Sequence, residues 1–248
     1  MKLVSICAVS LAVVGLTFAA CDNKKKTEPA PAQVHPAMKA PAKAEPIAKV
    51  EPAAKPAPVA KPAPAVAKTT LAVGSAAPDF TLSDADGNEV VLSKLQGKIV
   101  VLEWFNPDCP FVKYAYKDGP LREQAKKTVG DDIVWLQVNS GAAGKQGHGV
   151  ERNKKAREDW ALPSAVLIDE DGSVGRLYEA KTTPHLFIVD KAGKLAYRGG
   201  IDNAPLGNAP EGEASINYVS SAIADIAAGK PVSVPETKAY GCSVKYVN

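Results

Sequence analysis

The sequence predicts an α/β fold in which strands alternate with helices around a central β-sheet. Two continuous apolar runs, at 99–105 and 132–139, have the length of strands that are buried on both faces. Helix-like stretches separate these runs from each other and from later strands. Turn residues at Asp86-Gly87 and at 190–193 indicate two hairpins, one near each end of this region.

The predicted elements follow this alternation along residues 70–248. Their order is a hairpin over 78–82 and 89–92, a central strand at 99–105, a helical stretch over 110–128 interrupted at Gly119-Pro120, a strand at 132–139, a helix over 150–160, a short strand at 165–168, a hairpin over 185–189 and 194–198, and a helix over 214–228. In the last helix apolar residues recur at helical spacing from Ile216 to Ile226, and Gly229 provides a stop signal.

Composition and charge restrict the class of protein. Of the 248 residues, 46% are hydrophobic and 23% are charged, which is typical of a globular protein and excludes fibrous and wholly disordered chains. The net charge of +3 is unevenly spread, because residues 22–68 hold nine lysines against four acidic residues, whereas residues 70–248 carry a net charge of −3. A mildly acidic domain presents no basic surface for nucleic acid, so nucleic-acid binding is not expected.

Residues 1–20 have the features of a signal peptide. Lys2 supplies the positive charge, an apolar run follows, and small residues precede Cys21. The segment Phe18-Ala19-Ala20-Cys21 resembles the lipobox of bacterial lipoproteins, with Phe in place of the usual Leu. This resemblance implies that Cys21 is lipidated and anchors the protein to a membrane. The expected location is the bacterial cell envelope, outside the cytoplasm. Asp22 resembles an inner-membrane retention signal and favours that membrane where enteric sorting rules apply.

Residues 21–69 are expected to form a disordered linker. Ala, Pro and Lys dominate this segment, and its prolines exclude a helix because proline lacks a backbone donor and fixes φ. Such a chain favours extended conformations and holds a domain on the order of 100 Å from its anchor. A solvated spacer is the simpler interpretation, and binding of its lysines to anionic lipid or cell-wall polymer is the alternative.

Two thiols, Cys109 and Cys242, remain in the domain once Cys7 is removed with the signal peptide and Cys21 is lipidated. Cys109 follows the strand at 99–105 across a short turn and precedes Pro110, a residue that favours the first position of a helix. Unpaired amides and the helix dipole stabilise an anion there, so the pKa of the Cys109 thiol should be lowered. Cys109 is therefore the candidate nucleophile, and a buried structural cysteine is the alternative.

Several motifs give the domain a family resemblance. The segment WFNPDCPFV at 104–112 resembles the active-site strand, turn and helix of the thioredoxin superfamily, and TTP at 182–184 resembles its cis-proline loop. GSAAPDFTL at 74–82 resembles the opening of redoxin domains of the alkyl hydroperoxide reductase/thiol-specific antioxidant group. Further segments resemble a peroxiredoxin-like subgroup of bacterial redoxins: NSGAAGKQG (139–147), AKTTPHLFIVD (180–190), YRGGID (197–202) and YGCSVKY (240–246). The resemblance implies a thioredoxin-like fold, with a central mixed β-sheet, flanking helices and an N-terminal β-hairpin.

The resemblance also implies roles for residues near a catalytic Cys109. A cis Thr183-Pro184 bond would expose the backbone of Thr183 for pairing with a substrate chain, so both residues are substrate-binding candidates. His185 follows directly and is a candidate acid/base, and the alternative is that it faces away from Cys109.

The active-site segment departs from two known patterns. Thioredoxins carry a second cysteine three residues after the first, where this sequence has Val112. Peroxiredoxins use a cysteine at that second position, with Thr or Ser three residues before their cysteine, whereas Asn106 stands three before Cys109. A standard peroxidase site is therefore not expected, and peroxide reduction would need another geometry in which the Cys109 thiolate becomes a sulfenic acid.

Cys242 is the candidate resolving cysteine. It lies beyond the last predicted helix, on a tail bounded by Pro231 and Pro235 that is long enough to fold back across the domain. Two thiols in an exported protein often pair, because the environment is oxidising. Three outcomes stay open: a redox-active pair with Cys109, a structural disulfide, or two cysteines that never meet.

Metal chemistry is the weaker interpretation of these residues. A copper site of Cys109, Cys242 and a histidine uses suitable soft ligands, but no paired-ligand spacing supports it. His148 lies in a glycine-rich segment and is expected to be a solvated loop residue. Neither a metal nor a cofactor is expected.

These observations predict a membrane-anchored, extracytoplasmic thiol-disulfide oxidoreductase that acts on thiol or disulfide proteins or on small thiols. Cys109 attacks the substrate in this interpretation, and Cys242 resolves the product. Two alternatives remain: a thiol-dependent peroxidase of the antioxidant type, and a non-catalytic redoxin-fold module that binds a protein partner or a metal.

Overall fold

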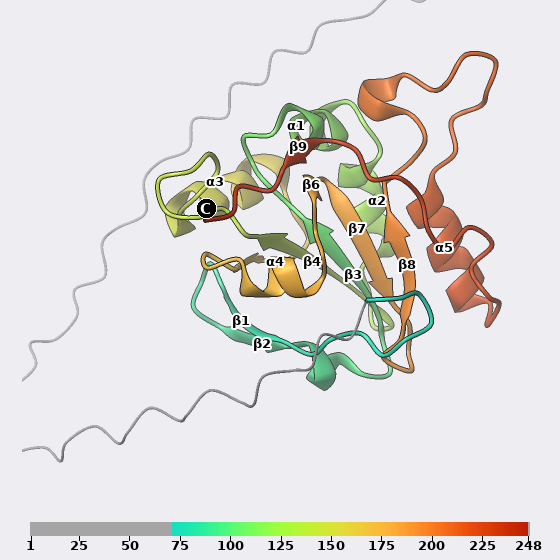
Figure 1. Cartoon of the computed structure of the whole chain (residues 1–248), viewed down its shortest axis with the longest axis horizontal. Helices are drawn as coiled ribbons and strands as arrows, with labels where there is room; N and C mark the ends of the chain where they lie inside the picture. The colour runs from blue at the N-terminus through green and yellow to red at the C-terminus, as the bar shows by residue number, and fades with distance from the viewer. Residues whose placement is uncertain (1–70, 248) are drawn as a thin grey trace, which may run out of the picture. The chain divides into compact units, whose positions relative to one another are not determined.

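The fold is built on strand β3 (Ile99–Trp104), whose six residues are all buried. The computed structural model describes residues 71–247, so the predicted signal peptide, Cys21 and the whole of the predicted linker with its charge pattern lie outside the described residues. β3 belongs to a seven-stranded sheet of order β2-β1-β5-β4-β3-β7-β8 (Figure 1). The other strands of this sheet are β1 (Thr81–Asp84), β2 (Glu89–Val91), β4 (Ile133–Asn139), β5 (Val166–Ile168), β7 (His185–Val189) and β8 (Leu195–Gly199).

The sheet is mixed, as the sequence predicts. β3 runs parallel to β4, and β4 runs parallel to β5, whereas β7 is antiparallel to both β3 and β8. The N-terminal hairpin of β1 and β2 joins the sheet through an antiparallel contact between β1 and β5. The register of β3 and β7 places Trp104 opposite His185. The carboxyl end of β3 therefore meets the segment that enters β7.

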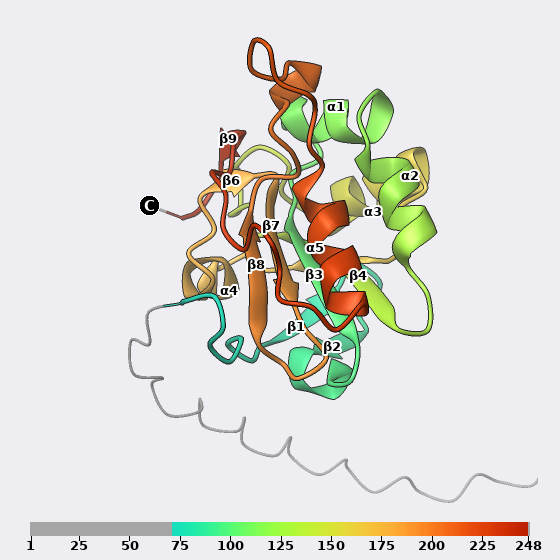
Figure 2. The same cartoon turned by 90° about the vertical axis from the view of Figure 1, so that its right-hand side faces the viewer.

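Helices cover both faces of the sheet (Figure 2). α1 (Pro110–Lys117), α2 (Leu121–Thr128), α3 (Val150–Trp160) and α5 (Tyr218–Ala227) lie on one face, and α4 (Ser173–Leu177) lies on the other. Alternate residues of β3 enter two different cores: Val101 packs with the four helices, whereas Leu102 packs with α4. Cys109 belongs to the core of the four helices.

The last helix is shorter than predicted. It begins at Tyr218 because Asn217 is its N-cap, with a side chain that accepts a hydrogen bond from the Ser220 backbone amide at 2.9 Å. Ile216 consequently lies in the preceding loop and is 45% exposed, so the prediction that it belongs to the apolar face of this helix is wrong.

Some short elements were not predicted from the sequence. They are α4, the two-residue strands β6 (Thr182–Thr183) and β9 (Cys242–Ser243), and the 3-10 turns η1 (Leu92–Leu95) and η2 (Pro205–Gly207). β6 and β9 pair with each other and form a separate two-stranded sheet. Within residues 71–247, no helix has the length and apolar character required to cross a membrane.

Candidate active site

The candidate active site begins at the turn that leaves β3. The Asn106 side chain accepts a hydrogen bond from the Asp108 backbone amide at 2.8 Å, which closes the turn. Cys109 then adopts an extended backbone as the N-cap of α1, and Pro110 occupies the first helical position. The thiol is therefore at a helix start, as predicted, where backbone amides favour a negative charge.

A second segment holds this turn in place. The Asn106 side chain donates to the Gln146 carbonyl at 3.2 Å, and the Gln146 side chain donates to the Asp108 carbonyl at 3.2 Å. Arg152 of α3 donates to the Asp108 carboxylate at 2.8 Å and to the Pro107 carbonyl at 3.1 Å. The hydrogen bond from Arg152 lowers the pKa of Asp108, so this ion pair persists at neutral pH. These contacts fix the backbone that carries Cys109.

The turn before β7 lies against the thiol. Thr183-Pro184 is a cis peptide bond, which confirms the prediction made from the TTP motif. The Cys109 Sγ donates a hydrogen bond to the Thr183 carbonyl oxygen at 3.0 Å. Thr183 is also buried, and its hydroxyl is one of the groups that favour the ionised form of the Cys109 thiol.

The structure brings Cys242 to the same place. β9 pairs antiparallel with β6, with Cys242 opposite Thr183. Both cysteines are free thiols. The tail thus folds back across the domain, as the sequence analysis allowed, and places Cys242 in the strand beside the Thr183 turn.

The pKa values of the two thiols are shifted in opposite directions. Burial opposes ionisation of Cys109, but hydrogen bonds from the Cys242 thiol, the Val112 amide and the Thr183 hydroxyl outweigh it and lower the pKa of Cys109. Burial raises the pKa of Cys242 to about 11, and the hydrogen bond to Cys109 and the charge on Cys109 contribute to this rise. At neutral pH Cys109 is the thiol that ionises more readily, and Cys242 keeps its proton.

His185 lies apart from Cys109. Its ring packs on Phe187, with centroids 4.4 Å apart, and its Nδ1 accepts from the Lys181 amide at 3.3 Å. Phe187 belongs to the core that includes α4, so His185 faces away from the core that holds Cys109. Burial and the neighbouring Lys181 and Arg198 lower the pKa of His185 to about 4. The facing-away alternative therefore describes this histidine, and an acid/base role for it has no contact to support it.

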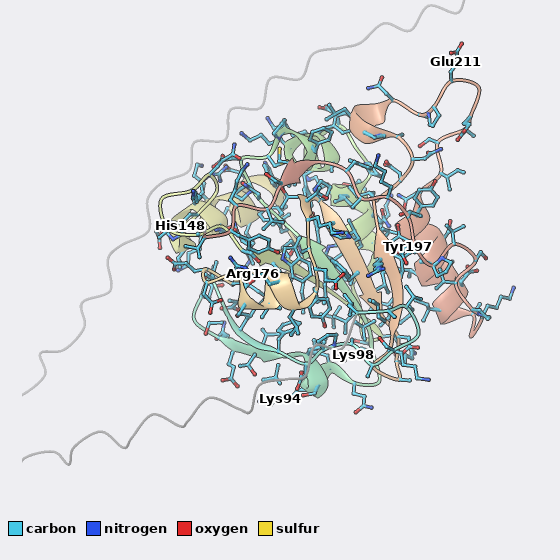
Figure 3. All side chains as sticks on the ribbon, viewed as in Figure 1. Lys94, Lys98, His148, Arg176, Tyr197 and Glu211 are labelled. Atoms are coloured by element: carbon cyan, nitrogen blue, oxygen red, sulfur yellow. The ribbon has the colours of Figure 1, made fainter. Side chains whose placement is uncertain are left out.

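The remaining polar candidates do not form a metal site. His148 lies on the loop before α3, where its Nε2 is 2.9 Å from the Glu170 carboxylate (Figure 3). Among residues 71–247, no group of three or more His, Cys, Asp or Glu side chains is arranged to hold a metal ion.

Glu103 is a chemically unusual residue that the sequence analysis missed. It lies in β3, is fully buried, and accepts hydrogen bonds from the Tyr116 hydroxyl at 2.5 Å and from Trp135 Nε1 at 3.0 Å. Burial raises the pKa of its carboxyl to about 7. The signal in the sequence was an acidic residue within the apolar run at 99–105, because a buried strand seldom holds a carboxylate.

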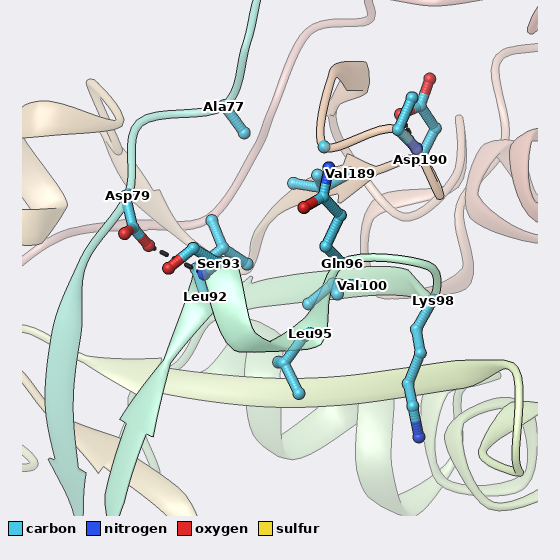
Figure 4. A pocket seen from close by; sticks show the side chains of 12 residues that line it. Ala77, Asp79, Leu92, Ser93, Leu95, Gln96, Lys98, Val100, Val189 and Asp190 are labelled. Atoms are coloured by element: carbon cyan, nitrogen blue, oxygen red, sulfur yellow. Dashed lines mark hydrogen bonds between the residues drawn. The ribbon is translucent and has the colours of Figure 1, made fainter.

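A pocket at the other end of the sheet carries none of this chemistry. It has a volume of about 180 Å³ and is lined by residues of η1 and of the turn between β7 and β8 (Figure 4). Asp79 lines it, but its carboxylate already accepts from the Ser93 amide at 2.9 Å. Val100 and Val189 also line the pocket, and they pair at the opposite end of β3 from Trp104 and the active-site turn.

Comparisons with known proteins show the family and the fold. The family model described as AhpC/TSA family matches residues 73–198. The protein named thiol-disulfide oxidoreductase ResA from Geobacillus thermodenitrificans (strain NG80-2) is 32% identical over 135 residues, which cover 52% of this chain and 69% of that protein. Peroxiredoxin Q, chloroplastic, from Oryza sativa subsp. japonica is 29% identical over 135 residues, which cover 50% of this chain and 57% of that protein.

Two solved structures resemble the fold more completely. An uncharacterized conserved protein from Geobacillus kaustophilus has 27% sequence identity and a TM-score of 0.64, and the match covers 72% of this chain and 94% of that one. A hypothetical protein from Sinorhizobium meliloti 1021 has 25% identity and a TM-score of 0.62, with 72% and 97% covered.

Proposed function

The chain belongs to the AhpC/TSA family of redoxins and has a thioredoxin-like fold, and from this premise we propose that it exchanges thiols and disulfides with Cys109 as the nucleophile and Cys242 as the resolving cysteine. The observation that carries the proposal is the meeting of three features at one point. Cys109 begins a helix, its sulfur contacts the cis Thr183-Pro184 turn, and β9 holds Cys242 beside that turn.

The opposite directions of the two pKa shifts support this assignment of roles. The thiolate is the attacking species in thiol-disulfide exchange, so the cysteine with the lowered pKa is the first to react. Cys242 keeps its proton partly because it hydrogen-bonds to Cys109 and lies beside the charge of that sulfur. Once Cys109 is bound in a mixed disulfide, its negative charge is gone. The charge on Cys109 and the hydrogen bond to that thiolate then no longer raise the pKa of Cys242.

The reaction balances in two steps. The Cys109 thiolate attacks one sulfur of a substrate disulfide, a bond forms between Cys109 and that sulfur, and the other substrate sulfur leaves as a thiolate. The Cys242 thiolate then attacks Cys109 Sγ, which forms the Cys109–Cys242 disulfide and releases the second substrate thiolate. The substrate is reduced by two electrons and the protein is oxidised, so a dithiol donor must reduce the pair before the next turnover.

Insulin reduction with a dithiol donor tests this proposal. The unaltered chain should accelerate insulin reduction, and Cys109→Ser should abolish the acceleration. Cys242→Ser should accumulate mixed disulfides on Cys109 that a reducing gel dissolves. A chain that shows no turnover and no mixed disulfide would instead fit a non-catalytic module that binds a partner.

Peroxide reduction is the second candidate. Peroxiredoxins carry a Thr or Ser hydroxyl three residues before their cysteine, where this chain has Asn106, and the Thr183 hydroxyl lies near the Cys109 sulfur instead. The Cys109 thiolate would attack the peroxide, become a sulfenic acid and release an alcohol or water. Cys242 would then condense with the sulfenic acid to form a disulfide and water. Peroxide consumption that depends on a dithiol and on Cys109 would support this activity, and its absence beside insulin reduction would exclude it.

The proposed setting is the bacterial cell envelope, with the protein anchored by a lipid on Cys21 and extended from the membrane by the linker at 21–69. The support is the lipobox-like segment that ends at Cys21 and the proline content of the linker. Thiol or disulfide proteins would be the partners in that compartment, where disulfides persist.

A further inference from the structure

The C-terminal tail covers the reactive sulfur. Cys109 is 0% exposed, although it stands at a helix start near the surface. The tail at 240–247 passes this point, where β9 lies beside β6 (Figure 1). Two further backbone bonds continue the pairing: the Val244 amide donates to the Lys181 carbonyl at 3.1 Å, and the Ala142 amide donates to the Lys245 carbonyl at 2.9 Å. A substrate can reach the sulfur only after this segment moves.

The tail is attached by surface contacts on both sides of Cys242. Upstream, the Tyr240 hydroxyl donates to the Asp202 carboxylate at 2.6 Å. Downstream, the Tyr246 hydroxyl donates to the Ala180 carbonyl at 2.8 Å, and the Arg176 guanidinium lies 4.7 Å from the centre of the Tyr246 ring. None of the residues 240–247 is fully buried, although Cys242 and Val244 pack partly against the two cores. A short segment that is only half-buried opens at a lower free energy than the core, so it can leave as a unit.

The tail pairs with the same strand edge that a substrate strand would use. In the open state the Thr182 and Thr183 backbone would present an unpaired strand edge beside the nucleophile, and such an edge binds extended peptides by antiparallel pairing. The tail fills that edge and presents a cysteine opposite Thr183, where its thiol reaches Cys109.

The position before Cys242 in the tail accepts only glycine. Gly241, the residue before the cysteine, has φ of 131°, a conformation that side-chain-bearing residues rarely adopt. A Cβ added there would overlap the Thr183 carbonyl oxygen and would stand 3.2 Å from the Pro184 ring. The groove therefore has no space for a side chain at the position before the reacting cysteine.

We propose that the tail is an internal mimic of the substrate: the groove along Thr182-Thr183 binds extended protein segments that carry glycine immediately before the reacting cysteine, and the tail and such a segment exclude each other. This inference rests on the proposed function. During turnover the substrate strand enters as the tail leaves, Cys109 forms the mixed disulfide, and the returning tail displaces the substrate strand while Cys242 displaces its sulfur.

Two activated peptides test the inference on the full chain. Cys7, Cys21 and Cys242 are replaced by Ser, so that Cys109 is the one thiol left. One peptide copies the tail sequence AYGCSVKY, its cysteine joined to thionitrobenzoate, and the other has Ala in place of Gly. Attack by Cys109 joins it to the peptide and releases coloured thionitrobenzoate, which gives the rate. We expect the glycine peptide to react at least about tenfold faster, while free glutathione reacts equally with both.

A substitution in the tail tests the competition. Adding Gly241→Ala to this chain should weaken the docking of the tail and raise the rate with the glycine peptide by about tenfold. Gly193→Ala is the matched control, because Gly193 also has a positive φ but a Cβ there meets no atom within 4 Å, and it lies in the turn between β7 and β8. The rate with this control should stay unchanged.

The outcomes separate the two proposals. Equal rates for both peptides, or an unchanged rate after Gly241→Ala, would overturn the inference while Cys109 remained a reactive nucleophile. If Cys109 reacted with neither peptide and the unaltered chain failed to reduce insulin, the proposed function itself would be wrong.

Discussion

Replacing Glu103 by Gln should reveal a pH dependence of stability that the native chain conceals. Burial raises the pKa of Glu103 to about 7, above its ordinary 4.5, so the unfolded chain loses this proton first. The stability that Glu103 contributes is fully present below pH 4.5 and is lost as the pH rises through 7. At 1.36 kcal/mol per pKa unit, the loss amounts to about 3 kcal/mol.

His185 acts in the opposite direction over nearly the same range. Burial lowers its pKa to about 4, below its ordinary 6.5, so the unfolded chain binds this proton first. The stability that His185 contributes is fully present above pH 6.5 and is lost as the pH falls through 4, again by about 3 kcal/mol. The two changes nearly cancel, and the native chain should have almost constant stability between pH 4.5 and 6.5.

Urea denaturation at several pH values measures these contributions. In Glu103→Gln the free energy of unfolding should rise by about 3 kcal/mol from pH 4 to 6.5, because His185 then acts alone. In His185→Gln it should fall by about 3 kcal/mol from pH 4.5 to 7, and the double variant should be flat. The slope is the informative quantity, since either substitution also changes packing. A Glu103→Gln chain whose stability is flat or falls with pH would refute the reasoning.

Three further predictions concern the cysteines. Alkylation rates measured against pH should show a Cys109 pKa below roughly 8.5, the ordinary pKa of a free cysteine. Thr183→Val should raise this midpoint, because it removes a hydroxyl that favours the thiolate. A native midpoint at or above the ordinary pKa would contradict activation at the helix start. Oxidation of Cys109 and Cys242 closes a loop of about 130 residues and should stabilise the domain by about 5 kcal/mol in the loop-closure account. Urea unfolding midpoints measured with and without a dithiol give this gain in stability. If Cys242→Ser showed the same difference between the two midpoints, the Cys109–Cys242 disulfide would not be its cause. Radioactive fatty acid should label the native protein but not Cys21→Ser, and persistent label on that variant would refute the lipid anchor.

The sequence predicted the elements whose residues repeat at a regular spacing. β3 and β4 are mostly apolar because both of their faces are covered, and the helices α1 and α2 are separated at Gly119-Pro120, as their sequence indicates. The cis bond at Thr183-Pro184 followed from a motif rather than from spacing. These features are determined by residues close to one another in the sequence, so they could be predicted from it.

The arrangement around Cys109 depends on contacts that no local pattern records. β6 and β9 have two residues each, which is too short for an alternation of apolar and polar side chains, and they lie about 60 residues apart in the sequence. Burial of Cys109 results from that distant pairing. The polar turn residues beside Cys109 therefore do not indicate its full burial, although its position at the helix start is as expected.

The position of Cys242 would give the proposed mechanism a conformational step that a Cys-x-x-Cys motif lacks. A cysteine at position 112 would sit in the first turn of α1, and Val112 there is fully buried in the core. A thiol so placed stays near Cys109 throughout turnover. Cys242 lies on a surface strand instead, so its local concentration at Cys109 depends on whether β9 is paired with β6. In the mechanism proposed above, substrate binding at β6 would lower that concentration and prolong the mixed disulfide, and re-pairing of the tail would restore it. Resolution by Cys242 would then be timed by strand exchange as well as by thiol chemistry.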